Sequence, residues 1–351
     1  MAQTDNPFFV PSALPYQLPP FADIRPEHYL PAFERAFAEH RQEVNAITFV
    51  RSMPTFENTM VALETSGKLL DTVAHTFYTI SSADATPEYQ ALDEAIAPLM
   101  SAHSDAIQLD SALYWRVKTL HDQLDELGLD AEQRYLVQRH FREMTHAGAA
   151  LDDETKEQLK ALNLRLSTLT TTFEKNLLAD TNELALIVDD VAELDGLTSG
   201  ELSAAAQAAT DRGHEGAYAL TLTLYTGHPY LSMLTNRATR KRLMDASRTK
   251  SNRGGPNDNR EVLLEIVRLR ADRAALLGYD NHAAYVTADE TAGSPEAVHA
   301  LLRQLAPPAA ANALREEAAL QAIADADVIL VEPVVSEVRE RPSTNENSFD
   351  T

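Results

Sequence analysis

The 351-residue chain contains no cysteine at all and only one tryptophan. The absence of cysteine excludes disulfides, thiolate nucleophiles, iron–sulfur clusters and cysteine-based zinc sites. Any metal ion would have to bind through histidine, aspartate or glutamate side chains. The sequence also lacks any run of about 20 apolar residues, and its first residues show no basic segment followed by an apolar one. We therefore expect a cytoplasmic protein with no membrane partner.

Positive charge is scarce as well. The chain has 30 lysine and arginine residues against 53 aspartate and glutamate residues, which gives a formal net charge of −23. Because a phosphate backbone is repelled by such a surface, we expect no nucleic-acid partner. The hydrophobic content of 44% and the charged content of 24% are typical of a folded protein with a sizeable core.

Helical periodicity dominates the sequence, and we predict a mainly α fold. The longest periodic segment covers residues 151–181, where Asp152 or Asp153 is expected to cap the helix start. Its apolar positions recur at steps of three and four residues: Leu159, Leu162, Leu166, Leu169 and Phe173. A coiled-coil seam is the competing interpretation, but the pattern is too short to favour it. Gly278 is expected to end one helix, and Ser294 to cap the start of another.

Three stretches depart from the helical pattern. Residues 1–24 are rich in proline and are expected to be extended over the surface of the protein. A small β element is predicted near residues 184–226, where LALIVDDV and AYALTLTLY are short, apolar or alternating runs. Alanine is frequent up to Ala326 and absent afterwards, so residues 327–351 are predicted to be an unrelated, disordered tail. The helical region is accordingly placed at residues 25–326.

A zinc peptidase site of the helical type needs the motif H-E-x-x-H, in which two histidines four residues apart grip the metal and the glutamate activates water. The chain has 11 histidines, and no two of them are four residues apart. The nearest fragment, HEGAY at His214, has Tyr218 in the place of the second ligand. We therefore assign no catalytic residue and no metal-binding residue, and the substrate-binding residues are unknown from the sequence.

Other candidate motifs also have simpler structural explanations. TSGKLL around Gly67 lacks the spacing of a phosphate-binding loop and is interpreted as close helix packing. RGGPND does not follow a strand, so it is no dinucleotide fingerprint. GLTSG at Gly196 has the wrong spacing for a nucleophile elbow. The acidic pair Asp189 and Asp190 is interpreted as loop and cap residues, with cation binding as the alternative.

Two further segments leave alternatives open. His228 and Tyr230, in TGHPYLSML, are consistent either with a groove or with packing, and packing is favoured. Four cations form a basic helix in this acidic chain: Arg237, Arg240, Lys241 and Arg242. They would suit either the anionic end of a peptide or a solvated helix face.

Five stretches of the chain together resemble a known family. They are NPFFVPSALPYQLPPF, IRPEHYLPAFERAF, PTFENTMVALETSGKLLDTVAHTFY, the segment from HFREMTHAGAAL to LLADT, and the segment from HPYLSMLTNRATRKRL to ALLGYDNHAAYV. In order and spacing, from about Asn6 to about Ala326, they are similar to the N-terminal part of the thimet-oligopeptidase family of metallopeptidases. The bacterial peptidyl-dipeptidase and oligopeptidase A branch is the most similar one.

The resemblance implies the N-terminal part of a helical, two-lobed zincin (neurolysin-like) fold whose channel admits short peptides. It also implies one zinc ion in the family, bound by the histidines of H-E-x-x-H and a later glutamate. Those groups lie in the C-terminal half of the family's proteins, and no position of this chain matches them. Zinc is therefore the cofactor of the family, and we expect this chain to bind none.

Three functional hypotheses follow from the sequence. The first is a truncated, catalytically inert part of a zinc oligopeptidase whose substrates are short peptides, with the composition break near Val328 indicating an interrupted reading frame. A fragment of this kind is expected to self-associate through exposed apolar faces. The alternative is a non-catalytic helical module that binds peptides or a partner chain. The third, an active metallopeptidase, lacks the residues that would activate water.

Overall fold

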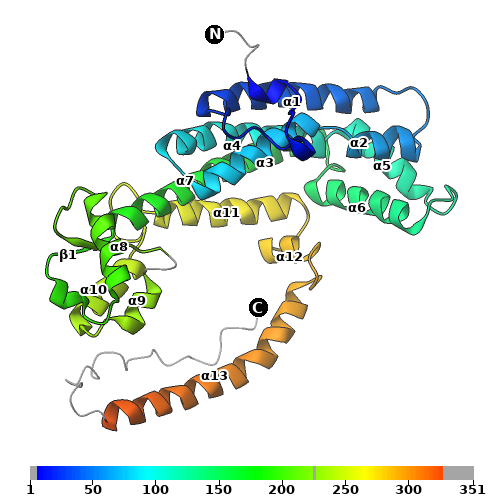
Figure 1. The fold of residues 1–351 in the computed structure, drawn as a ribbon. Helices are drawn as coiled ribbons and strands as arrows, with labels where there is room; N and C mark the ends of the chain where they lie inside the picture. The colour runs from blue at the N-terminus through cyan, green and yellow to red at the C-terminus, as the bar shows by residue number, and fades with distance from the viewer. Residues whose placement is uncertain (1–5, 224–226, 327–351) are drawn as a thin grey trace. The chain divides into compact units, whose positions relative to one another are not determined.

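The computed structural model describes residues 6–223 and 227–326 and divides the chain into two compact units, Met1–His282 and Ala283–Thr351 (Figure 1). Helices make up most of the described residues, and a single two-stranded sheet accompanies them, which confirms a mainly α fold with a small β element. None of the described helices combines the length and the apolar character that a membrane crossing requires. The boundaries proposed at residues 24 and 326 stay predictions, and residues 327–351 lie outside the described part.

An aromatic core holds the first helices together. Three helices enclose it: α1 (Pro26–Thr48), α3 (Lys68–Ala83) and α4 (Pro87–Gln108). Tyr29 and Phe33 of α1 are fully buried, and both meet Phe77 edge-on at ring-centroid distances of 5.2 and 5.8 Å. The chain before α1, predicted to be extended, contains two short 3₁₀ turns, η1 (Pro7–Phe9) and η2 (Pro15–Gln17).

A second core lies beside the first and is organised around a buried arginine. Five elements form it: the C-terminal part of α1, η3 (Phe56–Val61, a π-helical turn), α2 (Ala62–Glu64), α5 (Ser111–Asp122) and α6 (Ala131–Ala147). Arg116 is 1% exposed and donates to the side-chain oxygens of Asn58 and Thr59, at 2.6 and 3.2 Å. Those bonds satisfy the guanidinium and fix the π-helical turn, which the sequence pattern did not predict.

The long helix α7 (Asp153–Glu183) packs on α4 and on α11 (Arg260–Leu276), as Figure 1 shows. The Asp152 carboxylate caps its start by accepting a hydrogen bond from the amide of Thr155 at 2.8 Å. Leu166 and Leu169 are buried against Ile266 of α11. The apolar face of the helix is thus covered within its own unit, so the coiled-coil interpretation is not needed.

The remaining part of the first unit contains the sheet. Strand β1 (Leu186–Val188) pairs antiparallel with β2 (Tyr218–Leu220) in the register Leu186↔Leu220. Four short helices surround the pair: η4 (Val191–Leu194), α8 (Ser199–Thr210), α9 (His228–Met233) and α10 (Arg237–Arg248). The predicted strands are correct in place and shorter than the apolar runs that indicated them.

At the C-terminal end of the described chain, the predicted stops and starts are confirmed. Gly278 follows α11 with φ +79°, and the amides of Gly278 and Tyr279 donate to the carbonyls of Ala275 and Ala274. This is the pattern of a glycine-terminated helix. After α12 (His282–Thr287), the Ser294 hydroxyl caps α13 (Pro295–Ala326), and α13 has no buried residue.

Candidate functional site

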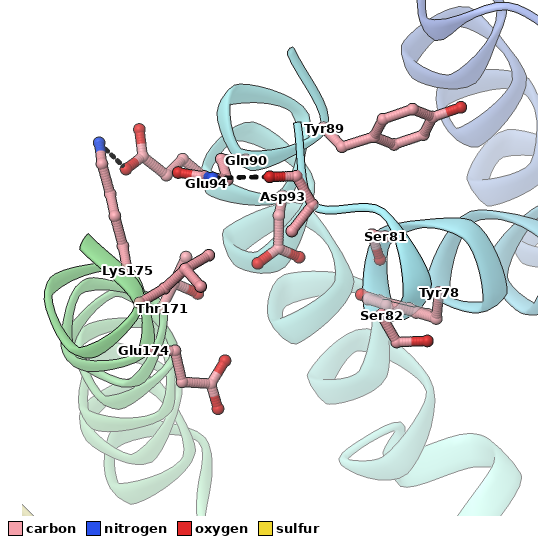
Figure 2. A pocket seen from close by; sticks show the side chains of 12 residues that line it. Tyr78, Ser81, Ser82, Tyr89, Gln90, Asp93, Glu94, Thr171, Glu174 and Lys175 are labelled. Carbon is pink, nitrogen blue, oxygen red and sulfur yellow. Dashed lines mark hydrogen bonds and ion pairs between the residues drawn. The ribbon is translucent and has the colours of Figure 1, made fainter. Parts of the chain in front are cut away.

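A hollow of about 330 Å³ opens between the helices α3, α4 and α7 (Figure 2). Because α7 comes more than 40 residues after the consecutive helices α3 and α4, the site exists only in the folded chain. Twelve residues line it: Tyr78, Ser81, Ser82, Ala85, Tyr89, Gln90, Asp93, Glu94, Thr171, Glu174, Lys175 and Leu178. We call this hollow the α3–α4–α7 groove.

Two carboxylates in the groove have no cationic partner. The side chains of Asp93 and Glu174, from α4 and α7, receive no hydrogen bond or ion pair within the described residues, whereas Glu94 pairs with Lys175. Burial raises the pKa of Asp93, and the nearby charges of Glu174 and Glu94 raise it further. The groove therefore has an unbalanced negative potential that favours a cationic ligand.

Tyr78 of α3 contributes the aromatic wall of the groove. Burial raises the pKa of its phenol, and the charge of Asp93 raises it further, so the hydroxyl stays protonated at neutral pH. An aromatic face beside carboxylates is an arrangement that suits an ammonium or guanidinium group. No histidine or cysteine lines the groove, so it offers binding groups rather than a nucleophile with its base.

A second hollow continues the groove along α4 and α7. It has a volume of about 470 Å³ and shares Tyr78, Asp93, Thr171 and Glu174 with the first. Ser101, Ser104 and other small residues line its far part. The two hollows together provide an elongated surface that is acidic at its middle.

The segments singled out in the sequence have structural roles in the fold. The amide of Gly254 in RGGPND donates to the Asp258 carboxylate at 2.6 Å, and Arg253 binds the buried Asp180 of α7 at 2.6 Å. Asp190 caps η4, and Tyr230 is buried in the core beside the sheet. These placements confirm the capping interpretation for Asp190 and the packing interpretation for Tyr230, whereas His228 is exposed and not packed.

The basic helix α10 is not a free cationic face. Arg240 donates to the carbonyls of Leu234 and Thr235 at 2.6 and 2.8 Å. Lys241 pairs with Asp245 at 2.6 Å, four residues further along the same helix. Arg242 pairs with Glu193 at 2.8 Å and donates to the carbonyl of Ile187. Three of the four cations are engaged within their own unit, but Arg237, Lys241 and Arg242 are exposed, so α10 is a solvated helix face with paired charges.

The comparison with known proteins decides the relationship. A family model described as "Peptidase family M3" matches residues 230–336. The chain is 37% identical over 322 residues to the "Dipeptidyl carboxypeptidase" of Escherichia coli (strain K12), and the alignment covers 92% of this chain. This chain is homologous to part of the proteins of peptidase family M3.

Two further M3 relatives show how far the similarity extends. "Oligopeptidase A" of Escherichia coli (strain K12) is 31% identical over 325 residues. "Organellar oligopeptidase A, chloroplastic/mitochondrial" of Arabidopsis thaliana is 28% identical over 275 residues, which cover 76% of this chain and 34% of that protein. The chain spans about half the length of the bacterial relatives, since the alignments cover 47% of each. The M3 match runs to residue 336, past the position where we predicted the family-like sequence to end.

The zinc ion that the M3 resemblance implies finds no fitting ligand set in residues 6–223 and 227–326. No three histidine, aspartate or glutamate side chains gather there as a metal site would require. His40 and His103 come together, but their ring nitrogens lie 2.9 Å apart and are hydrogen-bonded to each other. Two imidazoles that share one tetrahedral zinc would hold their nitrogens about 3.3 Å apart, with no proton between them. His214 is exposed beside β2, without a second histidine.

The groove is the feature that reasoning from the sequence missed. In the sequence, Asp93 and Glu174 have the pattern of ordinary solvent-exposed helix residues. They lie 81 residues apart, so no local pattern connects them. Only the packing of α4 against α7 turns both toward one hollow. The nearest signal was the acidic excess of the whole chain, which gives no position.

Proposed function

We propose that this chain is the helical, non-catalytic part of an M3-type peptidase of short peptides, and that it cleaves no peptide by itself. The alignment over 92% of the chain with a dipeptidyl carboxypeptidase is the observation that carries the proposal. It is supported by the sequence, in which no two histidines have the spacing that H-E-x-x-H demands. A cytoplasmic location remains part of the proposal.

The chemical reason for inactivity is the lack of an activated water. A metallopeptidase needs a zinc-bound water as nucleophile and positive charge that stabilises the oxyanion. The groove supplies carboxylates and a phenol, and neither the groove nor the histidine pair supplies a metal-ligand set. The chain would therefore hold a peptide without lowering the barrier to its hydrolysis.

A cleavage assay tests this function. The purified chain is incubated with zinc and an internally quenched peptide, in parallel with a full-length dipeptidyl carboxypeptidase. We expect chelator-sensitive cleavage by the full-length enzyme and none by this chain. Turnover by this chain that disappears on chelation would contradict the proposal.

The alternative function, a helical peptide-binding module, is favoured by the α3–α4–α7 groove. Its free carboxylates, Asp93 and Glu174, together with Tyr78, suit a peptide that carries a lysine or arginine side chain. Such binding requires no metal. Peptide binding is compatible with a lack of peptidase activity. The two proposed functions therefore differ in whether this chain binds peptides when it is alone.

Binding to the groove is measured with a fluorescent lysine-containing peptide and its acetylated counterpart. We expect the lysine peptide to bind more tightly by roughly tenfold, because acetylation removes the charge. Asp93→Asn should weaken binding and leave the free energy of unfolding unchanged or increased at pH 7, since the fold raises the pKa of that carboxyl. Equal affinity for both peptides would count against the module.

Solution behaviour separates the fragment from the module. An M3 fragment with uncovered apolar faces should self-associate or melt over a broad temperature range. A module that folds by itself should elute as a monomer and melt cooperatively. Size-exclusion chromatography followed by a thermal melt distinguishes these outcomes.

A further inference from the structure

A pair of histidines joins three elements of the first unit. His40 of α1 and His103 of α4 lie 2.9 Å apart, from Nδ1 of His40 to Nε2 of His103. On its other side, Nε2 of His40 lies 3.2 Å from the hydroxyl of Ser66, in the turn before α3. The groups are 63 and 26 residues apart in the chain, so the pair connects α1, α4 and the beginning of α3. We call this cluster the His40–His103 junction.

The junction is tightly packed. His103 is 5% exposed, and its ring packs against Phe37 at a tilt of 33° and a centroid distance of 4.8 Å. Gly67 adopts φ +74°, and a Cβ at this position would lie 3.2 Å from Cε1 of His40. The amide of Gly67 donates to the Glu43 carboxylate at 2.7 Å. Both histidine rings are therefore confined, and neither can turn away without moving the backbone that surrounds it.

The hydrogen bonds determine where the protons lie. The Ser66 hydroxyl donates to the carbonyl of Leu63 at 2.7 Å, so its oxygen is left to accept from Nε2–H of His40. Nδ1 of His40 must then be the acceptor, and Nε2–H of His103 the donor. Nδ1 of His103 is buried and carries no proton, and it has no hydrogen-bond partner among the described residues. Both rings are neutral in this arrangement, and both carry the proton on Nε2.

Adding a proton disrupts the arrangement. A proton on Nδ1 of His40 would point at Nε2–H of His103, so that two N–H groups would face each other without an acceptor. A proton on Nδ1 of His103 would create a buried positive charge with no hydrogen-bond acceptor. Three charged groups face the pair: Arg41 and Glu43 from α1, and Asp71 from α3. Burial lowers the pKa of His40 despite the opposing effect of the two carboxylates. Burial, with the charges of His40 and Arg41, lowers the pKa of His103 to about 4.

We propose that the His40–His103 junction is a pH-sensitive lock, which holds α1, α4 and the start of α3 together while both rings are neutral and releases them when a proton enters. Histidines of the unfolded chain take up protons near pH 6.5, whereas those of the junction do so only at lower pH. The contribution to stability is therefore intact above pH 6.5 and is lost progressively as the pH falls toward 4. Since α3 and α4 carry Tyr78 and Asp93, the release would also loosen the α3–α4–α7 groove.

The first test is a nitrogen NMR titration of the histidine rings in the full chain. The reference is a histidine in an unstructured peptide, which takes up its proton near pH 6.5. His103 should remain neutral down to about pH 4, and His40 should titrate below the reference peptide, both with the proton on Nε2. Protonation of His40 and His103 together with the reference peptide, or an Nδ1–H form of either ring, would overturn the proposal.

The second test compares variants by urea denaturation between pH 4 and pH 8. For each proton that the unfolded chain binds in excess of the folded chain, the equilibrium constant for unfolding rises about tenfold with each unit by which the pH falls. We expect His103→Gln to reduce this slope between pH 6.5 and 4, and His299→Gln, at an exposed residue of α13 outside the junction, is the matched control. An unchanged slope in His103→Gln would refute the lock. If that variant fails to fold, the titration of the unmodified chain still decides the question.

Discussion

Two helices of nearly equal length have opposite surroundings in this protein. The helix α7 has 31 residues and α13 has 32, and both place leucines at helical spacing. In α7, Leu159, Leu166 and Leu169 are buried, whereas α13 leaves Leu305 54% exposed and Leu320 67% exposed. The comparison teaches that helical periodicity predicts a helix and an apolar face, but not whether anything covers that face.

The energetic consequence follows from how helices are stabilised. Most of the stability of a helix in a protein comes from packing of its apolar face, because nucleation is costly and intrinsic propensity is weak. The helix α7 has that packing, against α4 and α11. Within the described part of its own unit α13 has no such packing, and it contains Pro307 and Pro308 in its interior. Proline there removes a backbone hydrogen bond and clashes with the preceding turn.

The largest expected contrast is in hydrogen exchange. Amides at the centre of α7 should exchange at least about 1,000-fold more slowly than those of α13, because they open only with the core. Mass spectrometry of peptides from both helices, after a timed exposure to deuterated water, provides the measurement. Equal protection of the two helices would contradict the difference in their surroundings and indicate that a second molecule or another segment covers α13.

A matched pair of leucine truncations sharpens the contrast. Leu169→Ala removes a side chain that is 4% exposed, and it should lower the free energy of unfolding by roughly 2–4 kcal/mol. Leu305→Ala, at a side chain that is 54% exposed, should change it by less than about 0.5 kcal/mol. Urea denaturation followed by circular dichroism measures both. A large loss in the Leu305 variant would show that α13 is packed in solution.

Polar contacts provide a smaller contrast. The Asp180 carboxylate of α7 is buried and accepts from Arg253 at 2.6 Å and from the Ser251 amide at 2.5 Å. Asp180→Ala leaves that amide without an acceptor and should cost about 2 kcal/mol. On α13, the exposed Asp325 accepts only from Gln321 within the described residues, and Asp325→Ala should be nearly neutral.

The pH dependence of Asp180→Ala provides a further check. Burial raises the pKa of Asp180, but the bonds from Arg253 and Ser251 more than offset it, so the folded pKa lies below the unfolded value. The stabilisation is therefore present above about pH 4 and is lost as the pH falls through the folded pKa. Denaturation profiles of the unmodified chain and Asp180→Ala should converge in acid. Parallel profiles would show that the carboxylate charge is not responsible.

Much of the fold was predictable from particular residues. The Asp152 cap, the Gly278 stop and the Ser294 start are local signals, and each depends on hydrogen bonds or dihedral angles within one turn. The similarity to peptidase family M3 was also predictable, from the order and spacing of the five short sequence stretches quoted above. The π-helical turn at Phe56–Val61 was not predicted, because the buried Arg116 that fixes it comes from a helix 50 residues later in the sequence.

The helices, the small sheet, the family relationship and the absence of the H-E-x-x-H spacing could be predicted from the sequence alone, because each depends on residues that are close together in the chain. Three features appear only once the chain is folded: Asp93 and Glu174 line one groove, His40 and His103 are hydrogen-bonded to each other, and the apolar face of α7 is covered. These properties depend on which helix faces meet, and long-range packing is not recorded in any local pattern.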